Sequence, residues 1–318
     1  MMLRHIVSPE EEGLTLQQLL RGLMGLSGRE AKTAKQQGAV TVDAAPFFAN
    51  QPVRAGMTVE VCLGGYAPRA SSPTASAPSA PNAAEAPAAL VRVLFEDDAL
   101  IAVHKPAMLQ CHPSPSAPRG SDTLEGRVSA LLGASVHPVH RLDAETTGIV
   151  LFAKLPYAQA HLQRQMQAGT FEKRYEAWAF GSPEPPAGEI DAPIARDTPE
   201  SFTRVVRGDG QRAVTRYQTL AVHAFPGGVA SRLSLFPMTG RTHQLRVHMA
   251  HIGCPLLGDT RYASGASKAV SQVLALSGHQ LAAVSLSFLH PLTHQRMLIS
   301  CPAVFSDRLA AWEEALSP

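Results

Sequence analysis

The chain has 318 residues, 45% of them hydrophobic and 17% charged, which is enough for a sizeable core and for two folded domains. Its 28 Lys and Arg against 26 Asp and Glu give a net charge of +2, which permits an acidic partner without requiring one. A chain that is basic throughout is excluded, so any nucleic-acid surface must be local and built from clustered arginines.

The cysteines and the N-terminus indicate a reduced, non-membrane compartment. Four cysteines are scattered without a CxxC pair, so neither a disulfide framework nor a zinc ribbon is indicated: Cys62, Cys111, Cys254 and Cys301. The first residues show no basic region followed by an apolar stretch, and no apolar run approaches the roughly 18 residues of a membrane helix. We expect a cytoplasmic protein with no membrane partner.

A small module is expected over residues 1–66. Leucines from Leu16 to Leu26 fall at helical spacing, a second helix is predicted from Ser27 to Gly38, and the short strands "AVTVD" and "MTVEVCL" follow. This order, with the turn "GLSGREAKTAKQQGAVTVD", resembles a small α/β RNA-binding module of the S4 type. Residues 1–64 carry six basic and six acidic groups, so strong RNA binding is not indicated. The RNA contacts expected on the second helix are Arg29, Lys32 and Lys35, and a merely solvated helix face is the alternative.

A flexible linker is predicted over residues 67–89. Ten Ala, five Pro and four Ser make 19 of its 23 residues. Such a composition buries too little apolar surface to offset the entropy of ordering the chain. Residues 90–318 then form the main domain.

Strands dominate the predicted elements after the linker. "VRVLFEDDALIAVHKP" predicts two strands around a turn, and "GIVLFAK" predicts a buried strand. "PYAQAHLQRQMQAG" predicts a helix between Pro156 and Gly169. The segments "FEKRYEAWAF", "AVTRYQTLAV" and "VASRLSLF" predict further strands, and "LAAVSLSFLHPLTHQRMLISCP" a closing hairpin before a short helix. The expected class is α+β, with a mixed, largely antiparallel sheet.

Asp143 is the first candidate for chemistry. In "HPVHRLDAETTGIVLFAK" it lies in a loop that a buried strand would hold rigidly, which is a common position for a catalytic group. The alternative is an Asp that caps the amides of the turn around Thr146 and Thr147. From this loop alone, the capping role is favoured.

The segment "TGRTHQLRVHMAHIGCPLLGD" adds a predicted helix from about Thr242 to His251, with Arg241 and Arg246 five residues apart. A guanidinium beside Asp143 would favour its ionised carboxylate. A metal site at His243, His248, His251 and Cys254 is the alternative. His243 and His248 lie about 140° apart around a helix, and no acidic ligand or HExxH is close, so the spacing disfavours a metal.

Tyr175, in "FEKRYEAWAF", is the third candidate. An amphipathic core tyrosine is the ordinary interpretation. A functional tyrosine would supply an aromatic platform for a base and a hydroxyl near the reacting carbon.

Together, "HRLDAETTG", "EKRYEAW" and "TGRTHQLRVHMAHIGCPLLGDTRY", in this order, resemble the RluA-type family of RNA pseudouridine synthases. The resemblance covers residues 91 to about 303. It implies isomerisation of uridine in ribosomal or transfer RNA, without a metal or other cofactor, after the base is flipped out of its stack. We expect the chain to act as a monomer.

The resemblance also implies residue roles. Asp143 matches the catalytic aspartate, which either attacks C1′ or removes the C2′ proton. Tyr175 matches the active-site tyrosine, and Arg246 matches the basic residue that pairs with the aspartate. Arg141 matches an arginine that holds the RNA. Arg241, His243 and Gln244 are expected either to touch RNA or to brace the loop.

Two positions depart from the family pattern. Met108 stands where glycine is common, which leaves the conformation of that loop open. Thr147 replaces a usual serine and keeps the hydroxyl. Two other functions remain: an inactive RNA-binding protein or folding chaperone, which the intact Asp143, Tyr175 and Arg246 disfavour, and a metal-dependent hydrolase.

Overall fold

The structure is a computed structural model that describes residues 2–22, 24, 26, 28–62, 91–113, 118, 120–225, 228–307 and 309. These residues divide into two compact units: one holds those from 2 to 62 with Leu155–His161, the other those from 91 to 154 and from 162 onward. The linker expected over residues 67–89 lies outside the described residues, as do the side chain of Arg29 and most of the closing helix. The domain boundaries stay a prediction.

The first unit contains a four-stranded antiparallel sheet and two short helices. The sheet order is β1-β4-β2-β3, with β1 at Met2–Ile6, β2 at Val40–Val42, β3 at Ala45–Pro46 and β4 at Thr58–Cys62. The helices are α1 (Leu16–Gly22) and α2 (Gly28–Gln36), after a 3-10 turn at Pro9–Glu11. Of the leucines predicted for the first helix, Leu16, Leu19 and Leu20 on α1 and Leu26 after it are buried, and Leu23 lies outside the described residues. Ala31 and Ala34 on α2 are buried as well. The expected helix-helix-strand order is therefore confirmed, preceded by β1, which the sequence patterns did not predict.

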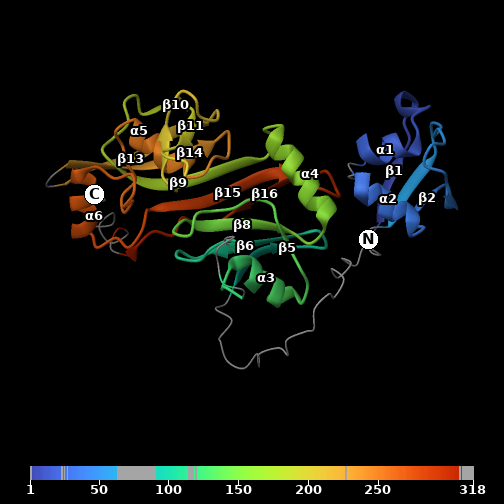
Figure 1. Ribbon diagram of the computed structural model, residues 1–318, viewed down its shortest axis with the longest axis horizontal. Helices are drawn as coiled ribbons and strands as arrows, with labels where there is room; N and C mark the ends of the chain where they lie inside the picture. Colours follow the sequence, from blue (N-terminus) through green and yellow to red (C-terminus); the bar gives the residue numbers. More distant parts are fainter. Residues whose placement is uncertain are drawn as a thin grey trace. The chain divides into compact units, whose positions relative to one another are not determined.

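The second unit is built on a ten-stranded sheet in the order β10-β13-β14-β9-β15-β8-β6-β5 (Figure 1). These strands are β5 (Arg92–Glu96), β6 (Leu100–Lys105), β8 (Thr147–Ala153), β9 (Glu172–Phe180), β10 (Ala187–Asp191), β13 (Val214–Phe225), β14 (Gly228–Pro237) and β15 (Leu281–Leu289). Two strands lie off this path: β7 (His137–Pro138) pairs with β8, and β16 (Arg296–Ser300) with β15. A separate pair is formed by β11 (Ile194–Arg196) and β12 (Arg204–Val206). All pairings are antiparallel except β8 with β15, so the predicted mixed, largely antiparallel sheet is confirmed.

The contact between β8 and β15 explains the glycine of "TTG". Gly148 has φ +107°, and a Cβ on it would lie 2.1 Å from the carbonyl oxygen of Ala283. Only glycine permits this approach of two backbones. Strand β8 is buried along its length from Gly148 to Ala153, so the loop before it is anchored in the core.

Among the described residues, the second unit contains the helices α3 (Leu124–Leu132), α5 (Gln244–His251) and α6 (Gly265–Val273), and α4 (Pro156–Gln167) has residues in both units. In Figure 1, α5 lies with β10, β11 and β14, and α3 lies beside β5 and β6. The sequence patterns predicted α4 and α5 but neither α3 nor α6. Both missed helices have N-caps, since Thr123 accepts from the Gly126 N–H and Ser264 from the Ser267 N–H. None of the helices in the described part of the chain is long and apolar enough to span a membrane.

Candidate active site

A cleft of about 290 Å³ lies where the loop before β8 meets the start of α5. Arg141 and Asp143 come from the loop, Tyr175 from β9, and His243 and Arg246 from the α5 segment, and all five line the cleft. These side chains are up to about a hundred residues apart in the chain. The three sequence motifs therefore meet in one place, which we call the Asp143 cleft.

Arg246 connects two carboxylates. Its Nε and Nη2 donate to both oxygens of Asp259 at 2.7 and 2.9 Å, and its Nη1 donates to Asp143 Oδ2 at 3.3 Å. The Arg246 side chain is 7% exposed and that of Asp259 is fully buried, whereas Asp143 keeps 23%. Asp259 thus fixes the guanidinium plane, and the remaining nitrogen is directed at the more accessible carboxylate.

The pKa shifts of Asp259 and Arg246 are consistent with a strong pairing between these two side chains. Burial alone would raise the pKa of Asp259, but the hydrogen bonds and charge of Arg246 hold it below its usual value. Burial opposes the charge on Arg246, yet the two carboxylates raise its pKa above the ordinary arginine value. At neutral pH the arrangement therefore contains a permanent cation paired with the ionised Asp259.

His243 completes this side of the cleft. Its Nε2 lies 3.9 Å from Asp143 Oδ2, and its Nδ1 is 2.8 Å from the hydroxyl of Tyr262, whose ring lies under Arg246 at 5.0 Å. Burial lowers the pKa of His243 to about 4, although the nearby Asp143 acts in the opposite direction. The ring is therefore neutral at pH 7. His243 also has a left-handed backbone with φ +58°, an unusual conformation that is typical of functional positions.

Tyr175 and Lys105 approach Asp143 from the sheet. Tyr175 is 7% exposed, and burial, followed by the charge of Asp143, raises its pKa well above the usual tyrosine value. The phenol is therefore protonated at neutral pH. Lys105 is fully buried and donates to the carbonyls of Pro106, Leu109 and Ala144 at 2.8, 2.7 and 2.7 Å. It ties the loop after β6 to the residue that follows Asp143.

The turn after Asp143 is held by His279. The Thr146 N–H donates to the Asp143 carbonyl at 3.1 Å, and the Thr146 hydroxyl lies 2.8 Å from His279 Nε2. Glu145 Oε2 accepts the His279 N–H at 3.1 Å and lies 2.8 Å from Nδ1 of the same residue. The backbone carbonyl of Asp143 thus closes the turn, while its side chain faces Arg246 in the cleft.

The expected RNA-binding residues have different surroundings. Arg141 and Arg241 are exposed and line the Asp143 cleft, and Arg241 Nε donates to the Arg212 carbonyl at 3.0 Å. Gln244 is 4% exposed, accepts from Thr239 and from the Arg241 N–H, and donates to Val214 and Thr215. Its amide is therefore hydrogen-bonded within the protein through both its oxygen and its nitrogen. Lys32 and Lys35 lie on α2 of the first unit, Lys32 exposed and Lys35 partly so.

The histidines proposed as alternative metal ligands are used differently. Both ring nitrogens of the buried His248 are engaged, Nδ1 with the Thr215 hydroxyl and Nε2 with the Ala192 carbonyl, each at 2.9 Å. His243 is directed toward Asp143 and Tyr262 instead. Within the described ranges, no group of three or more His, Cys, Asp or Glu side chains is placed to hold a metal ion.

Several residues of the site were missed from the sequence. Asp259 was part of the quoted motif, and its position directly after the apolar "PLLG" was the available signal. Lys105 carried no sequence signal beyond a lysine at the end of an apolar strand. Met108, flagged as a departure, adopts φ +63° with an exposed side chain, so the loop keeps a conformation that favours glycine.

Comparisons with known proteins point to one family. The family model for RNA pseudouridylate synthase matches residues 99–251, which include Asp143, Tyr175 and Arg246. The chain is 35% identical to the dual-specificity RNA pseudouridine synthase RluA of Pasteurella multocida, covering 67% of this chain and 93% of the relative. An uncharacterized RNA pseudouridine synthase of Mycobacterium bovis is 32% identical, over 91% of each chain.

Solved structures show the same fold. Human RNA Pseudouridylate Synthase Domain Containing 4 is 25% identical, with a TM-score of 0.55 over 71% of this chain and 92% of that structure. Human RNA Pseudouridylate Synthase Domain Containing 1 has a TM-score of 0.56 at 20% identity, over 74% of this chain and 98% of that structure. With these relatives and the geometry of the Asp143 cleft, the chain belongs to the RluA-type family of RNA pseudouridine synthases.

Proposed function

We propose that Asp143 is the catalytic carboxylate with which this RNA pseudouridine synthase isomerises uridines of ribosomal or transfer RNA. The observation that carries the proposal is the Arg246 bridge, which orients the partly accessible carboxylate of Asp143 in a cleft shared with Tyr175 and Arg141. A carboxylate in this state is prepared either to attack C1′ or to remove the C2′ proton.

The reaction balances without a further reactant. The N1–C1′ bond breaks, the uracil turns, the C5–C1′ bond forms, and the proton lost from C5 is matched by one gained at N1. Nothing is oxidised or reduced, so we propose that no cofactor is needed. The neutral Tyr175 phenol is suited to stack on uracil and hydrogen-bond to it, and its raised pKa disfavours a phenolate base.

Reaching the target requires base flipping. A stacked uridine cannot reach a cleft whose reacting carboxylate is 23% exposed, so we propose that it is turned out of its stack at a cost of a few kcal/mol, less in a loop. Arg141 and Arg241, which are exposed and line the cleft, would hold phosphates of the flipped strand. We propose that the neutral His243 contacts the RNA and that the chain acts as a monomer.

We propose an accessory role for the first unit, as an S4-like RNA-binding module over residues 1–66 on a linker over 67–89. Its contacts would be Arg29, Lys32 and Lys35 on α2. The catalytic domain is then residues 90–318. The family model matches residues 99–251, which lie outside this module, so we propose that the module adds affinity rather than chemistry.

The test of the catalytic role is Asp143→Asn. The amide keeps the size of the carboxylate but neither attacks C1′ nor accepts the C2′ proton, so pseudouridine formation should vanish while RNA affinity stays within about threefold. The matched control is Asp122→Asn, a 61% exposed carboxylate on the surface, which should leave the rate unchanged. Product formation by Asp143→Asn would remove Asp143 from this role.

The RNA class has its own test. Carbodiimide-stop sequencing of total RNA from cells with and without the gene should reveal pseudouridines in ribosomal or transfer RNA that depend on the gene. Restoration by the wild-type chain but not by Asp143→Asn assigns those positions to this enzyme. Gene-dependent sites confined to other RNAs would contradict the proposed substrate class.

A further inference from the structure

A second hollow adjoins the Asp143 cleft. It measures about 560 Å³ and shares part of its wall with the cleft, including Lys173, Pro237 and Gly240. Its other side includes Phe236 and Met238, at and just after the end of β14, and Arg216 on β13. We call it the flanking hollow. Because the same residues line both spaces, an RNA strand that leaves the Asp143 cleft past Lys173 would next reach the flanking hollow.

The apolar wall of the flanking hollow is held rigidly. The Met238 N–H donates to the Val214 carbonyl at 2.9 Å, and the Val214 N–H donates to the Thr239 hydroxyl at 2.9 Å. Phe236 is half-buried opposite Arg216 on the neighbouring strand, and Met238 is 45% exposed. A half-buried aromatic residue and an exposed thioether two residues further along the chain supply an apolar platform, which is the type of surface on which unpaired bases stack.

The charged side chains that line the flanking hollow are two cations and one carboxylate: Lys173, Arg216 and Glu172. Arg216 is offset by Glu189 at 2.8 Å, and Glu172 by Arg296 at 2.8 Å. Lys173 lines both spaces, and no carboxylate of the described residues forms an ion pair with it. Burial lowers the pKa of Lys173, which is the expected response of an ammonium group withdrawn from water without a counter-ion. An anion between the two spaces would supply the missing counter-ion.

We propose that the flanking hollow receives the base of a nucleotide next to the target uridine, stacked on Phe236 and Met238, while Lys173 binds the phosphate between the two nucleotides. The proposal rests on the proposed function, because it takes the target uridine to occupy the Asp143 cleft. It makes this hollow a determinant of substrate choice. An apolar platform discriminates between bases by the strength of stacking and not by a pattern of hydrogen bonds. Because a purine has the larger stacking surface, it should be preferred to a pyrimidine at this position.

The experiment combines substrate and enzyme changes. Hairpin RNAs carry an abasic residue, with its phosphate retained, at each position within two nucleotides of the target. At one position, removal of the base should lower wild-type kcat/KM about tenfold, since stacking of a base on an aromatic side chain is typically worth this much. In Phe236→Leu and Met238→Ser the same removal should cost less than about threefold, because the platform is already weakened.

The control for this comparison is Leu220→Ser on β13, which changes a side chain of similar exposure, 46% against 45% for Met238, outside both hollows. It should keep the full abasic penalty. Because each enzyme is compared with itself on two RNAs, a general loss of stability cancels. An equal penalty in the wild type and both platform variants at every position would overturn the stacking proposal.

Lys173→Gln tests the phosphate contact. The slope of log affinity against log salt should fall by about 0.7, the value for one phosphate contact with a single strand. An unchanged slope would overturn that assignment. These failures differ from failure of the proposed function, since in each case the wild type would still isomerise uridine and Asp143→Asn would still be inactive.

Discussion

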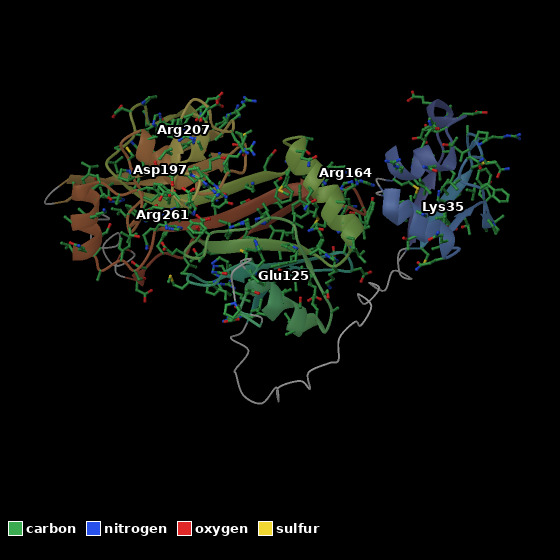
Figure 2. The ribbon with its side chains drawn as sticks, viewed as in Figure 1. Lys35, Glu125, Arg164, Asp197, Arg207 and Arg261 are labelled. Carbon is green, nitrogen blue, oxygen red and sulfur yellow. The ribbon has the colours of Figure 1, made fainter. Side chains whose placement is uncertain are left out.

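The charged groups of the Asp143 cleft and those of α2 differ in how they are held. Arg246 in the cleft and the nearby Asp259 and Lys105 are buried. Arg246 and Lys105 each donate three hydrogen bonds, and the Asp259 carboxylate accepts four. On α2, Lys32 projects into solvent and Lys35 is partly exposed, while the helix buries Ala31 and Ala34 (Figure 2 labels Lys35). The charged side chains at the cleft are therefore held in defined positions by hydrogen bonds, whereas the lysine side chains of α2 extend from an exposed surface.

This difference follows from what each region has to do. Bond cleavage requires the reacting groups to be placed to within a fraction of an ångström, so their orientation must be set before the substrate arrives. A phosphate contact tolerates a mobile ammonium group and needs only attraction that salt weakens. Substitutions in the cleft should therefore have large effects that depend on their partners, and substitutions on α2 small, additive ones.

The largest effect is expected for Arg246→Met. It leaves the fully buried Asp259 without its counter-ion, so the free energy of unfolding should fall by about 3–5 kcal/mol, and pseudouridine formation should be lost. Urea unfolding and a product assay measure the two effects.

The matched control is the double variant Arg246→Met with Asp259→Asn. The amide oxygen still accepts the backbone N–H groups of Arg261 and Tyr262, so at least half of the lost stability should return while activity stays absent. If stability does not recover, the unpaired charge of Asp259 is not the cause of the loss.

A smaller effect is expected for Lys105→Met. Without the bond from Lys105 to the Ala144 carbonyl, the Asp143 loop should shift, and kcat should fall about 10- to 100-fold with RNA affinity within about threefold.

The pH profile distinguishes this positioning role from general destabilisation. Burial lowers the pKa of Lys105 to about 8, so in the wild type kcat should decline as the pH rises through that value and the ammonium group loses a proton. In Lys105→Met that decline should be missing. A Lys105→Met enzyme with wild-type kcat would show that the buried lysine does not position the loop.

An effect of about 1 kcal/mol is expected from His140 on the wall of the cleft. Its Nε2 accepts the Leu151 N–H at 3.2 Å, and burial lowers its pKa to about 3. Below about pH 6.5 the unfolded chain binds a proton that the folded chain does not, so stability falls as the pH falls. Between pH 6.5 and 5.5 this histidine should remove about 1 kcal/mol, and His140→Gln should reduce the pH-dependent loss by that amount. Denaturant titrations at both pH values measure it, and an equal loss in the two proteins would refute the role of His140.

The smallest effect is expected for the double variant Lys32→Gln and Lys35→Gln. RNA affinity should fall only a few fold at physiological salt, with kcat unchanged, because two exposed cations contribute screened attraction alone. Binding measured across a salt series should show a slightly smaller slope. A loss of affinity of several decades would mean that α2 carries a structured RNA contact, and the contrast with the cleft would then fail.

Much of the catalytic unit could be predicted from local patterns. Alternating and continuous apolar runs predicted β5, β6, β8, β9, β13, β14 and the β15–β16 hairpin, and Gly and Pro marked the ends of α4 and α5. The local patterns did not predict α3, which contains Gly126, or α6, which follows a loop without apolar periodicity. For Asp143 the local evidence favoured a cap. Its carbonyl does close the turn, while its side chain is directed at Arg246.

The sequence by itself determined the motifs, their order and the elements that carry them, because helices, strands and turns depend on residues near one another in the chain. Only the tertiary structure decided which polar groups become partners. Arg246 meets Asp143 across 103 residues, and Lys105 meets Ala144 across 39. Such pairs depend on strand register and on the close approach of β8 and β15 at Gly148, which no local pattern contains.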